Sequence, residues 1–157
     1  MKQDFVIGKV SVHDAGEIEE MIRKEFPYFS PSREEIKERI SSNKFVTFKI
    51  NKGVKLAGFI EIEKLDEGEV RINGLTIKKE FRHKHAAKRL LEYSIGFLRE
   101  QGTERVRLLV KQSNKTAKAL YSQFGFEFIG LYHKKLDNDV VEEMGLSLIE
   151  EMPRYAA

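Results

Sequence analysis

The stretch that decides the fold is residues 70–87, VRINGLTIKKEFRHKHAA. Within it, residues 72–77 form a short apolar run that predicts a β-strand. A basic turn follows, and two alanines then open a helical pattern that continues to Leu98. A strand that leads through a tight turn into a helix presents unpaired backbone N–H groups and the positive end of the helix dipole. The stretch therefore predicts a site for a phosphate group.

The composition is that of a single domain spanning residues 1–157, with 41% hydrophobic residues to form one core. The chain has no cysteine, which excludes disulfides, a thiolate nucleophile and zinc–thiolate sites. It has neither an apolar run long enough to cross a bilayer nor a signal-peptide pattern, so we expect a cytoplasmic protein with no membrane partner. The net charge of +3 comes from interleaved acids and bases, as in residues 33–39, REEIKER, which does not favour a nucleic-acid partner.

The residues before this stretch predict two helices and three strands. Asp14 with Glu17, and Ser32 with Glu35, have the spacing of helix caps. The segment between the two helices contains two prolines and predicts a loop. Short turns rich in glycine, asparagine and aspartate join the later strands, which indicates antiparallel pairing. The expected elements are a strand at 5–12, helices at 15–25 and 33–43, and strands at 45–50, 56–65 and 69–77.

The residues after the basic turn alternate between helices and strands. A long helix ends at Gly102, and the next strand is apolar enough to be buried on both faces. The whole order is β-α-α-β-β-β-α-β-α-β-β, which predicts a mixed α/β fold with a mostly antiparallel, twisted sheet and helices on both faces. The expected elements are a helix at 86–100, a strand at 106–110, a helix at 114–124, and strands at 126–132 and 140–148.

Two motifs resemble those of the GNAT acetyltransferases, and the order of the elements is similar to that family along essentially the whole chain. The coenzyme-binding pattern Q/R-x-x-G-x-G/A is similar to residues 82–87, with Arg82 first and Ala87 last. The second pattern, N-x-x-A-x-x-x-Y followed by G-F, is matched by Asn114, Ala117, Tyr121, Gly125 and Phe126. His85 stands where the family usually has glycine, and we expect its side chain to impose an ordinary φ or a slightly wider loop.

The resemblance implies an acetyltransferase that uses acetyl-CoA as a co-substrate and acetylates a primary amine without a metal. It places the pyrophosphate on backbone amides of the basic turn and the pantetheine arm along the end of the preceding strand. It makes Tyr121 the catalytic residue that protonates the departing thiolate. The implied coenzyme-binding residues are Leu75, Thr76, Ile77, Arg82, His83, Lys84, His85, Ala86, Ala87, Lys88, Asn114 and Tyr121.

Some of these residues also fit structural roles. Taken alone, Asn114 fits an ordinary helix cap and Tyr121 fits a core aromatic residue. The spacing of His83 and His85 invites a metal, but Glu80 is the one nearby residue that could complete a ligand set, so we expect none.

The general base is not evident from the sequence. The strand positions where the family often carries a base hold Arg71, Asn73 and Leu109. The candidates elsewhere are Glu25, Glu61, Glu63 and His133.

The acceptor is suggested by the loop between the first two helices. The resemblance places Phe26, Pro27 and Tyr28 in the loop that forms the wall of the acceptor-binding site in this family. A similar F-P pair occurs there in some protein N-terminal acetyltransferases. Residues 110–114, VKQSN, are also similar to theirs. The resemblance therefore implies that the acceptor is a protein N-terminus or a peptide amine.

Two other functions remain open on the sequence alone. An acidic wall supplied by Glu61, Glu63 and Glu67 would favour a small amine of the polyamine or aminoglycoside type. The missing base would fit a non-catalytic acyl-CoA-binding regulatory module. Edge strands near the C-terminus leave a homo-oligomer open.

Overall fold

The computed structural model describes residues 4–27 and 29–149 and folds them into one seven-stranded sheet with helices on both faces. The strands are β1 (Phe5–Lys9), β2 (Phe45–Lys52), β3 (Lys55–Asp66), β4 (Glu69–Ile77), β5 (Arg105–Lys111), β6 (Glu127–Leu131) and β7 (Val141–Ser147). The helices are α1 (Ala15–Glu25), α2 (Arg33–Ser41), α3 (Ala86–Glu100) and α4 (Lys115–Gln123), with 3₁₀ turns η1 (Val12–Asp14) and η2 (Lys79–Phe81). The predicted mixed α/β fold is confirmed.

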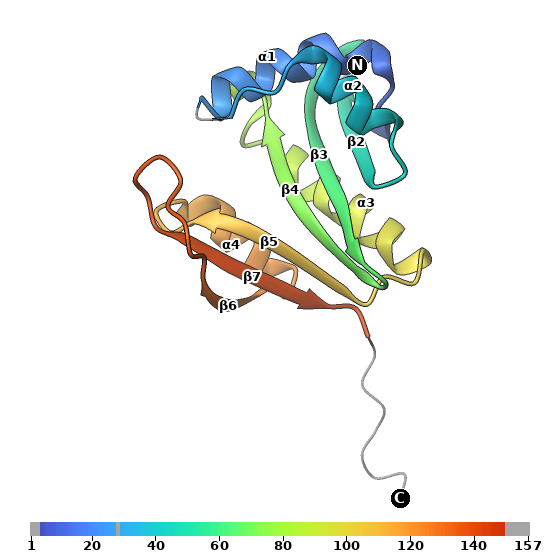
Figure 1. Cartoon of the computed structure of the whole chain (residues 1–157). Helices are drawn as coiled ribbons and strands as arrows, with labels where there is room; N and C mark the ends of the chain where they lie inside the picture. Colours follow the sequence, from blue (N-terminus) through green and yellow to red (C-terminus); the bar gives the residue numbers. More distant parts are fainter. Residues whose placement is uncertain (1–3, 28, 150–157) are drawn as a thin grey trace, which may run out of the picture.

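The sheet has the strand order β1-β2-β3-β4-β5-β7-β6. All neighbouring strands are antiparallel except β4 and β5, which are parallel. Helices α1 and α2 lie over one face of the sheet, and α3 and α4 lie behind it (Figure 1). No helix in the described part of the chain is long and apolar enough to span a bilayer.

The two faces of the sheet carry separate apolar clusters. Side chains of β3 such as Leu56 and Phe59 pack with α1 and α2, whereas Ile60 and Ile62 pack into the larger cluster with α3. The alternation of side chains along a strand places Phe59 on one face and Ile60 and Ile62 on the other. Leu56 joins Phe59 because the register of β3 against β2 shifts by one residue between Leu56 and Gly58. The prediction that β5 is buried on both faces is wrong, because Arg107 is exposed on the face opposite the buried Leu108.

The capping residues behave differently at the first two helices. The Oγ of Ser32 accepts a hydrogen bond from the N–H of Glu35 at 3.1 Å, so the predicted cap of α2 is confirmed. Asp14 makes no side-chain cap for α1. Its carboxylate instead accepts hydrogen bonds from the N–H of Ser11 at 2.9 Å and from Lys49 Nζ at 2.9 Å. The Asp14 carboxylate therefore bonds to Lys49 and to the start of η1, and the side-chain cap of α1 predicted from the sequence is absent.

The end of β4 is held tightly against β3. A Cβ atom on Gly58 would lie 2.5 Å from the carbonyl oxygen of Thr76 and 2.4 Å from Cδ1 of Ile77. The N–H of Lys78 also donates a hydrogen bond to the carbonyl of Ala57 at 2.7 Å. Glycine at position 58 thus permits the close contact that fixes the point where the chain leaves the sheet toward α3.

The pairing between β4 and β5 is short. Residues 69–72 of β4 pair with residues 105–108 of β5. Beyond Ile72, β4 stays paired with β3, and beyond Leu108, β5 stays paired with β7. The two strands therefore lie side by side where they begin and then diverge, as Figure 1 shows.

Candidate active site

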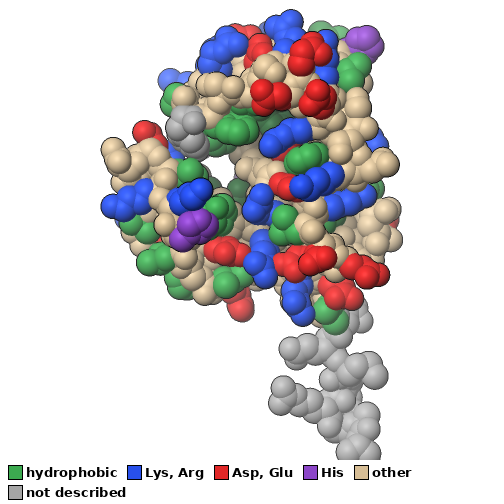
Figure 2. All heavy atoms as spheres, viewed as in Figure 1, with side chains coloured by type: hydrophobic (Ala, Val, Ile, Leu, Met, Phe, Trp, Pro, Cys, Tyr) green, Lys and Arg blue, Asp and Glu red, His purple; other side chains and the backbone are tan. Residues whose placement is uncertain are grey.

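The divergence of β4 and β5 opens the molecule at the centre of the sheet. Figure 2 shows a hollow in the surface between the part formed by β1–β4 and the part formed by β5–β7. On the β4 side, residues 73–77 have no strand partner toward β5. This edge includes the predicted pantetheine-binding residues Leu75, Thr76 and Ile77, of which Leu75 is half-buried and the other two are buried.

The turn between η2 and α3 has an unusual backbone. His83 and His85 both have a φ of +63°, in the left-handed region that glycine adopts most easily. Of the two expectations for His85, an ordinary φ or a slightly wider loop, the first is wrong, because histidine here takes a glycine-like conformation. A left-handed φ costs a residue with a side chain about 1–2 kcal/mol. Histidine at position 85 is thus held, at some cost in strain, in a backbone conformation that glycine would adopt without it.

The N-terminus of α3 has no side-chain cap. The first helical hydrogen bond runs from the N–H of Arg89 to the carbonyl of His85 at 3.0 Å, so the amides of residues 85–88 precede it. By contrast, Asn114 caps α4 by accepting a hydrogen bond from the N–H of Ala117 at 3.1 Å. Unpaired amides at the positive end of a helix dipole favour an anion. Lys84 and Lys88 are exposed beside these amides and add positive charge.

Arg82 connects the turn between η2 and α3 to two other parts of the chain. Its Nε donates a hydrogen bond to the carbonyl of Ile77 at 2.9 Å, and its Nη2 forms an ion pair with Glu25 at 2.5 Å. The side chain therefore links the loop to the end of β4 and to the last residue of α1. Glu25, a candidate base, is occupied by this pair.

The opposite side of the gap is formed by α4. Asn114 and Tyr121 lie two turns apart, with Lys118 between them on the same side of the helix. Lys118 Nζ forms an ion pair with Oε2 of the buried Glu142 at 2.7 Å. The sequence did not single out this pair, because it joins residues that are far apart in the chain. It holds α4 onto β7 and explains why a glutamate is tolerated inside that strand.

Tyr121 is buried, and its phenol is protonated at neutral pH. The ring packs edge-to-face on Phe126 with centroids 5.7 Å apart. Burial raises the pKa of the phenol to about 12, so the hydroxyl stays protonated at neutral pH.

The face of the sheet under α1 and α2 carries a polar network. Figure 2 shows acidic and basic side chains interleaved there. Arg39 Nη1 lies 2.9 Å from Glu61 Oε1, and Asn73 Nδ2 lies 3.0 Å from the same oxygen. Asn73 Nδ2 also lies 2.9 Å from Glu63 Oε1, which accepts a further bond from Arg71 Nη2 at 3.1 Å. The two carboxylates thus lie beside the point where β4 leaves β5.

Glu63 is the more strongly held of the two carboxylates. Burial acts to raise its pKa, but hydrogen bonds from Asn73 and Lys44 and the charge of Arg71 outweigh burial, and the pKa lies below its ordinary value. Glu63 is therefore a weak proton acceptor.

The remaining predicted residues are less closely grouped. Phe26 is half-buried at the end of α1, and Pro27 is exposed after it. Tyr28, predicted with them to wall the acceptor side, lies outside the described residues. His133, a candidate base, is exposed in the segment between β6 and β7, with its ring against Tyr132.

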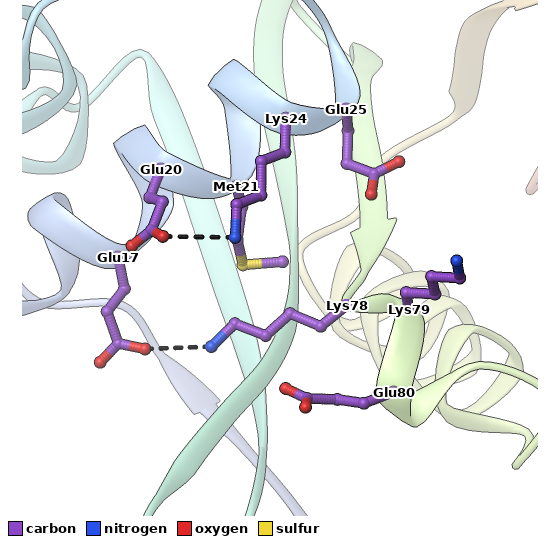
Figure 3. Close-up of a pocket in the computed structure, with 8 residues that line it drawn as sticks. All are labelled: Glu17, Glu20, Met21, Lys24, Glu25, Lys78, Lys79 and Glu80. Atoms are coloured by element: carbon purple, nitrogen blue, oxygen red, sulfur yellow. Dashed lines mark hydrogen bonds and ion pairs between the residues drawn. The ribbon is translucent and has the colours of Figure 1, made fainter.

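A pocket of about 700 Å³ lies between α1 and the turn that follows β4. Its charged side chains are largely paired with one another, as in Lys78 with Glu17 at 3.2 Å and Lys24 with Glu20 at 3.3 Å (Figure 3). Met21 is the apolar residue of its lining. The pocket adjoins the loop through Glu25, the partner of Arg82.

Comparisons with known proteins identify the family of the chain. Residues 15–126 match the model of the acetyltransferase (GNAT) family. The chain therefore belongs to this family, and the prediction of an acyltransferase of the GNAT class that acts with acetyl-CoA is confirmed. No curated protein matches the chain by sequence.

Solved structures share the fold at low sequence identity. The ribosomal-protein-S18-alanine N-acetyltransferase from Escherichia coli has a TM-score of 0.82 and 19% identity, over 96% of this chain and 98% of that chain. The PaiA N-acetyltransferase from Thermoplasma acidophilum, in complex with coenzyme A, has a TM-score of 0.73 and 21% identity, over 89% and 98%. NAA60 from Arabidopsis thaliana, in complex with a bisubstrate analogue, has a TM-score of 0.80 and 16% identity, over 92% and 98%.

The left-handed turn gives a prediction for stability. His85→Gly relieves a strained φ of roughly 1–2 kcal/mol, which offsets the entropy cost of glycine of about 0.5–1 kcal/mol. Lys84→Gly is the matched control. Lys84 has no positive φ, so this variant has the entropy cost of glycine without any relief of strain. Denaturant unfolding should therefore find His85→Gly more stable than Lys84→Gly by about 1–2 kcal/mol, because the entropy cost of glycine is common to both variants. Equal losses in the two variants would show that the turn carries no strain at His85.

Proposed function

We propose that the chain transfers the acetyl group of acetyl-CoA to the N-terminal amine of a protein or peptide. The observation that carries the coenzyme part of this proposal is the uncapped N-terminus of α3 beside the gap between β4 and β5. An anionic coenzyme fits there, because free amides and a helix dipole meet a basic loop at the end of an unpaired strand edge. We also keep the predictions that residues 1–157 form one domain and that the enzyme is cytoplasmic.

The residues around the gap fit acetyl-CoA in three parts. The amides of His83 to Lys88 would hold the pyrophosphate, with Lys84 and Lys88 adding charge. The main chain of residues 75–77 would pair with the amide groups of the pantetheine arm, as an added strand does. The side-chain NH2 of Asn114 stays available for the coenzyme, because the cap of α4 uses the carboxamide oxygen. Bound acetyl-CoA supplies the activated acetyl thioester.

Tyr121 has the properties of the general acid. Its phenol is protonated at neutral pH, because burial raises its pKa to about 12. A proton donor at the sulfur makes the thiolate a better leaving group. The buried ring and the Lys118–Glu142 ion pair would hold the hydroxyl in place.

The charges on the sheet face under α1 and α2, around Glu61 and Glu63, favour a peptide acceptor over a polyamine. A polycationic acceptor needs a surplus of negative charge, but Glu61 and Glu63 are balanced by Arg39, Arg71 and Lys44. Glu67, the third carboxylate of the proposed acidic wall, is exposed at the turn between β3 and β4. The structural similarity to NAA60 bound to a bisubstrate analogue, and to an enzyme named for the alanine of ribosomal protein S18, is consistent with a peptide acceptor.

A transfer assay tests the proposal. The full chain is incubated with acetyl-CoA and a panel of peptides with free N-termini, polyamines and aminoglycosides, and each acceptor is examined for the mass of one acetyl group. We expect the acetyl group on peptides, at the N-terminus. Modification of the small amines alone would favour the second acceptor class. Thermal stabilisation by acetyl-CoA with no transfer to any acceptor would favour a regulatory module.

Tyr121→Phe tests the catalytic residue. The variant keeps the ring and its packing on Phe126 but loses the proton donor. We expect kcat to fall by a factor of about 100–10,000, with little change in KM for acetyl-CoA or in Tm. A lower Tm with an unchanged kcat would instead indicate that Tyr121 acts only as a core residue. No change in either quantity would mean that the thiolate takes its proton from water.

A further inference from the structure

Glu61 lies on β3 beside the point where β4 separates from β5. Its side chain is 15% exposed, and its Oε1 accepts hydrogen bonds from Arg39 and Asn73. Asn73 is the first residue of β4 after the stretch that pairs with β5. The carboxylate of Glu61 therefore reaches the apex of the gap from the neighbouring strand.

The two oxygens of Glu61 differ in their contacts. Oε1 has two donors, whereas Oε2 receives no hydrogen bond from any residue in the described part of the chain. Oε2 is not an enclosed atom either, so it contacts solvent. Glu63 lies two residues further on the same face and uses both oxygens, Oε1 with Arg71 and Asn73 and Oε2 with Lys44 at 3.2 Å. Of the two carboxylates, Glu61 alone has an oxygen that receives no donor from the described residues, and that oxygen can accept from an N–H or O–H group.

Arg39 fixes the position of this carboxylate. Its guanidinium lies 4.9 Å from the ring centroid of Phe45 and 5.7 Å from that of Phe29. Phe45 begins β2, and Phe29 belongs to the segment between α1 and α2. Cation–π contacts of this kind restrict a long side chain. Oε1 of Glu61 is thus held from one side, which leaves Oε2 in a defined place.

The chemistry of acetyl transfer requires a proton acceptor at such a place. An N-terminal amine has an ordinary pKa of about 8, so near neutral pH it is largely an ammonium ion without a free lone pair. We propose that Glu61 takes the first proton of this ammonium ion, directly or through one water. The inference rests on the proposed function and supplies the base that Arg71, Asn73 and Leu109 do not provide.

The step balances in bonds and protons. An N–H bond of the ammonium ion breaks and its proton goes to Oε2 of Glu61. The freed electron pair forms the C–N bond to the acetyl carbon, the C–S bond breaks, and the sulfur takes a proton from Tyr121. A second proton leaves the nitrogen and restores the Tyr121 hydroxyl, and Glu61 releases its proton to water. One proton is thus released for each acetyl group transferred.

Four charged groups face Glu61 from the elements packed around it. They are Arg39 from α2, Lys44 before β2, Glu63 on β3 and Arg71 on β4. Two are arginines, and the pKa of Glu63 is lowered further from neutrality by its hydrogen-bond donors and neighbouring charges, which outweigh burial. A change in rate between about pH 6 and about pH 9 should therefore reflect the amine, whose ordinary pKa is near 8.

The test compares Glu61→Gln with Glu63→Gln at saturating acetyl-CoA, using a peptide with a free N-terminus. Glu61→Gln should lower kcat/KM for the peptide by about 100-fold near pH 6.5, within the range that a general base contributes. This deficit should shrink as the pH rises above the pKa of the amine, because a neutral amine needs no base. Glu63→Gln removes the neighbouring charge, and its deficit should not depend on pH. KM for acetyl-CoA and Tm report whether each variant remains folded.

The outcomes separate the inference from the proposed function. A deficit in Glu61→Gln that is independent of pH, or equal to that of Glu63→Gln, would overturn the role of Glu61 while transfer by the wild type stands. No transfer by the wild type to any amine would overturn both. As a second variant, Glu61→Ala should be partly rescued by added formate, which supplies the missing carboxylate, and Glu63→Ala should not.

Discussion

The short parallel ladder between β4 and β5 is the constraint on which the site depends. Four residues of β4, Glu69–Ile72, pair with β5, and the two strands then follow different partners. The basic loop follows β4 and the helix α4 follows β5, so the two sides of the gap are carried by diverging strands. A longer ladder would close the gap and leave no unpaired edge for a ligand.

Three ion pairs then fix the parts that surround this gap. Arg82–Glu25 joins the loop to α1, Arg39–Glu61 joins α2 to β3, and Lys118–Glu142 joins α4 to β7. Partly exposed pairs of this kind contribute roughly 0–1 kcal/mol to stability, so their role is chiefly orientation. Each one sets the direction of a side chain or backbone segment that faces the gap.

The sequence predicts the architecture well because its signals are local. The spacing of apolar residues, the turn residues and the motifs located every strand and α-helix to within a few residues. The resemblance to the GNAT family is confirmed. The left-handed φ of His85 could not be predicted, because the surrounding loop imposes a conformation that histidine disfavours on its own. The roles of Arg39 and Asn73 were also missed, since contacts across α2, β3 and β4 leave no mark at a fixed spacing in the chain.

The central claim is that acetyl-CoA occupies the gap with its phosphates on the amides at the start of α3. Amide hydrogen exchange with and without the coenzyme tests it most directly. Residues 75–77 and 83–88 should exchange more slowly when acetyl-CoA is present, because their N–H groups then have partners, whereas the edge strand β1 should be unchanged. Unchanged exchange in both segments at saturating coenzyme, or slowing confined to other regions, would contradict the account.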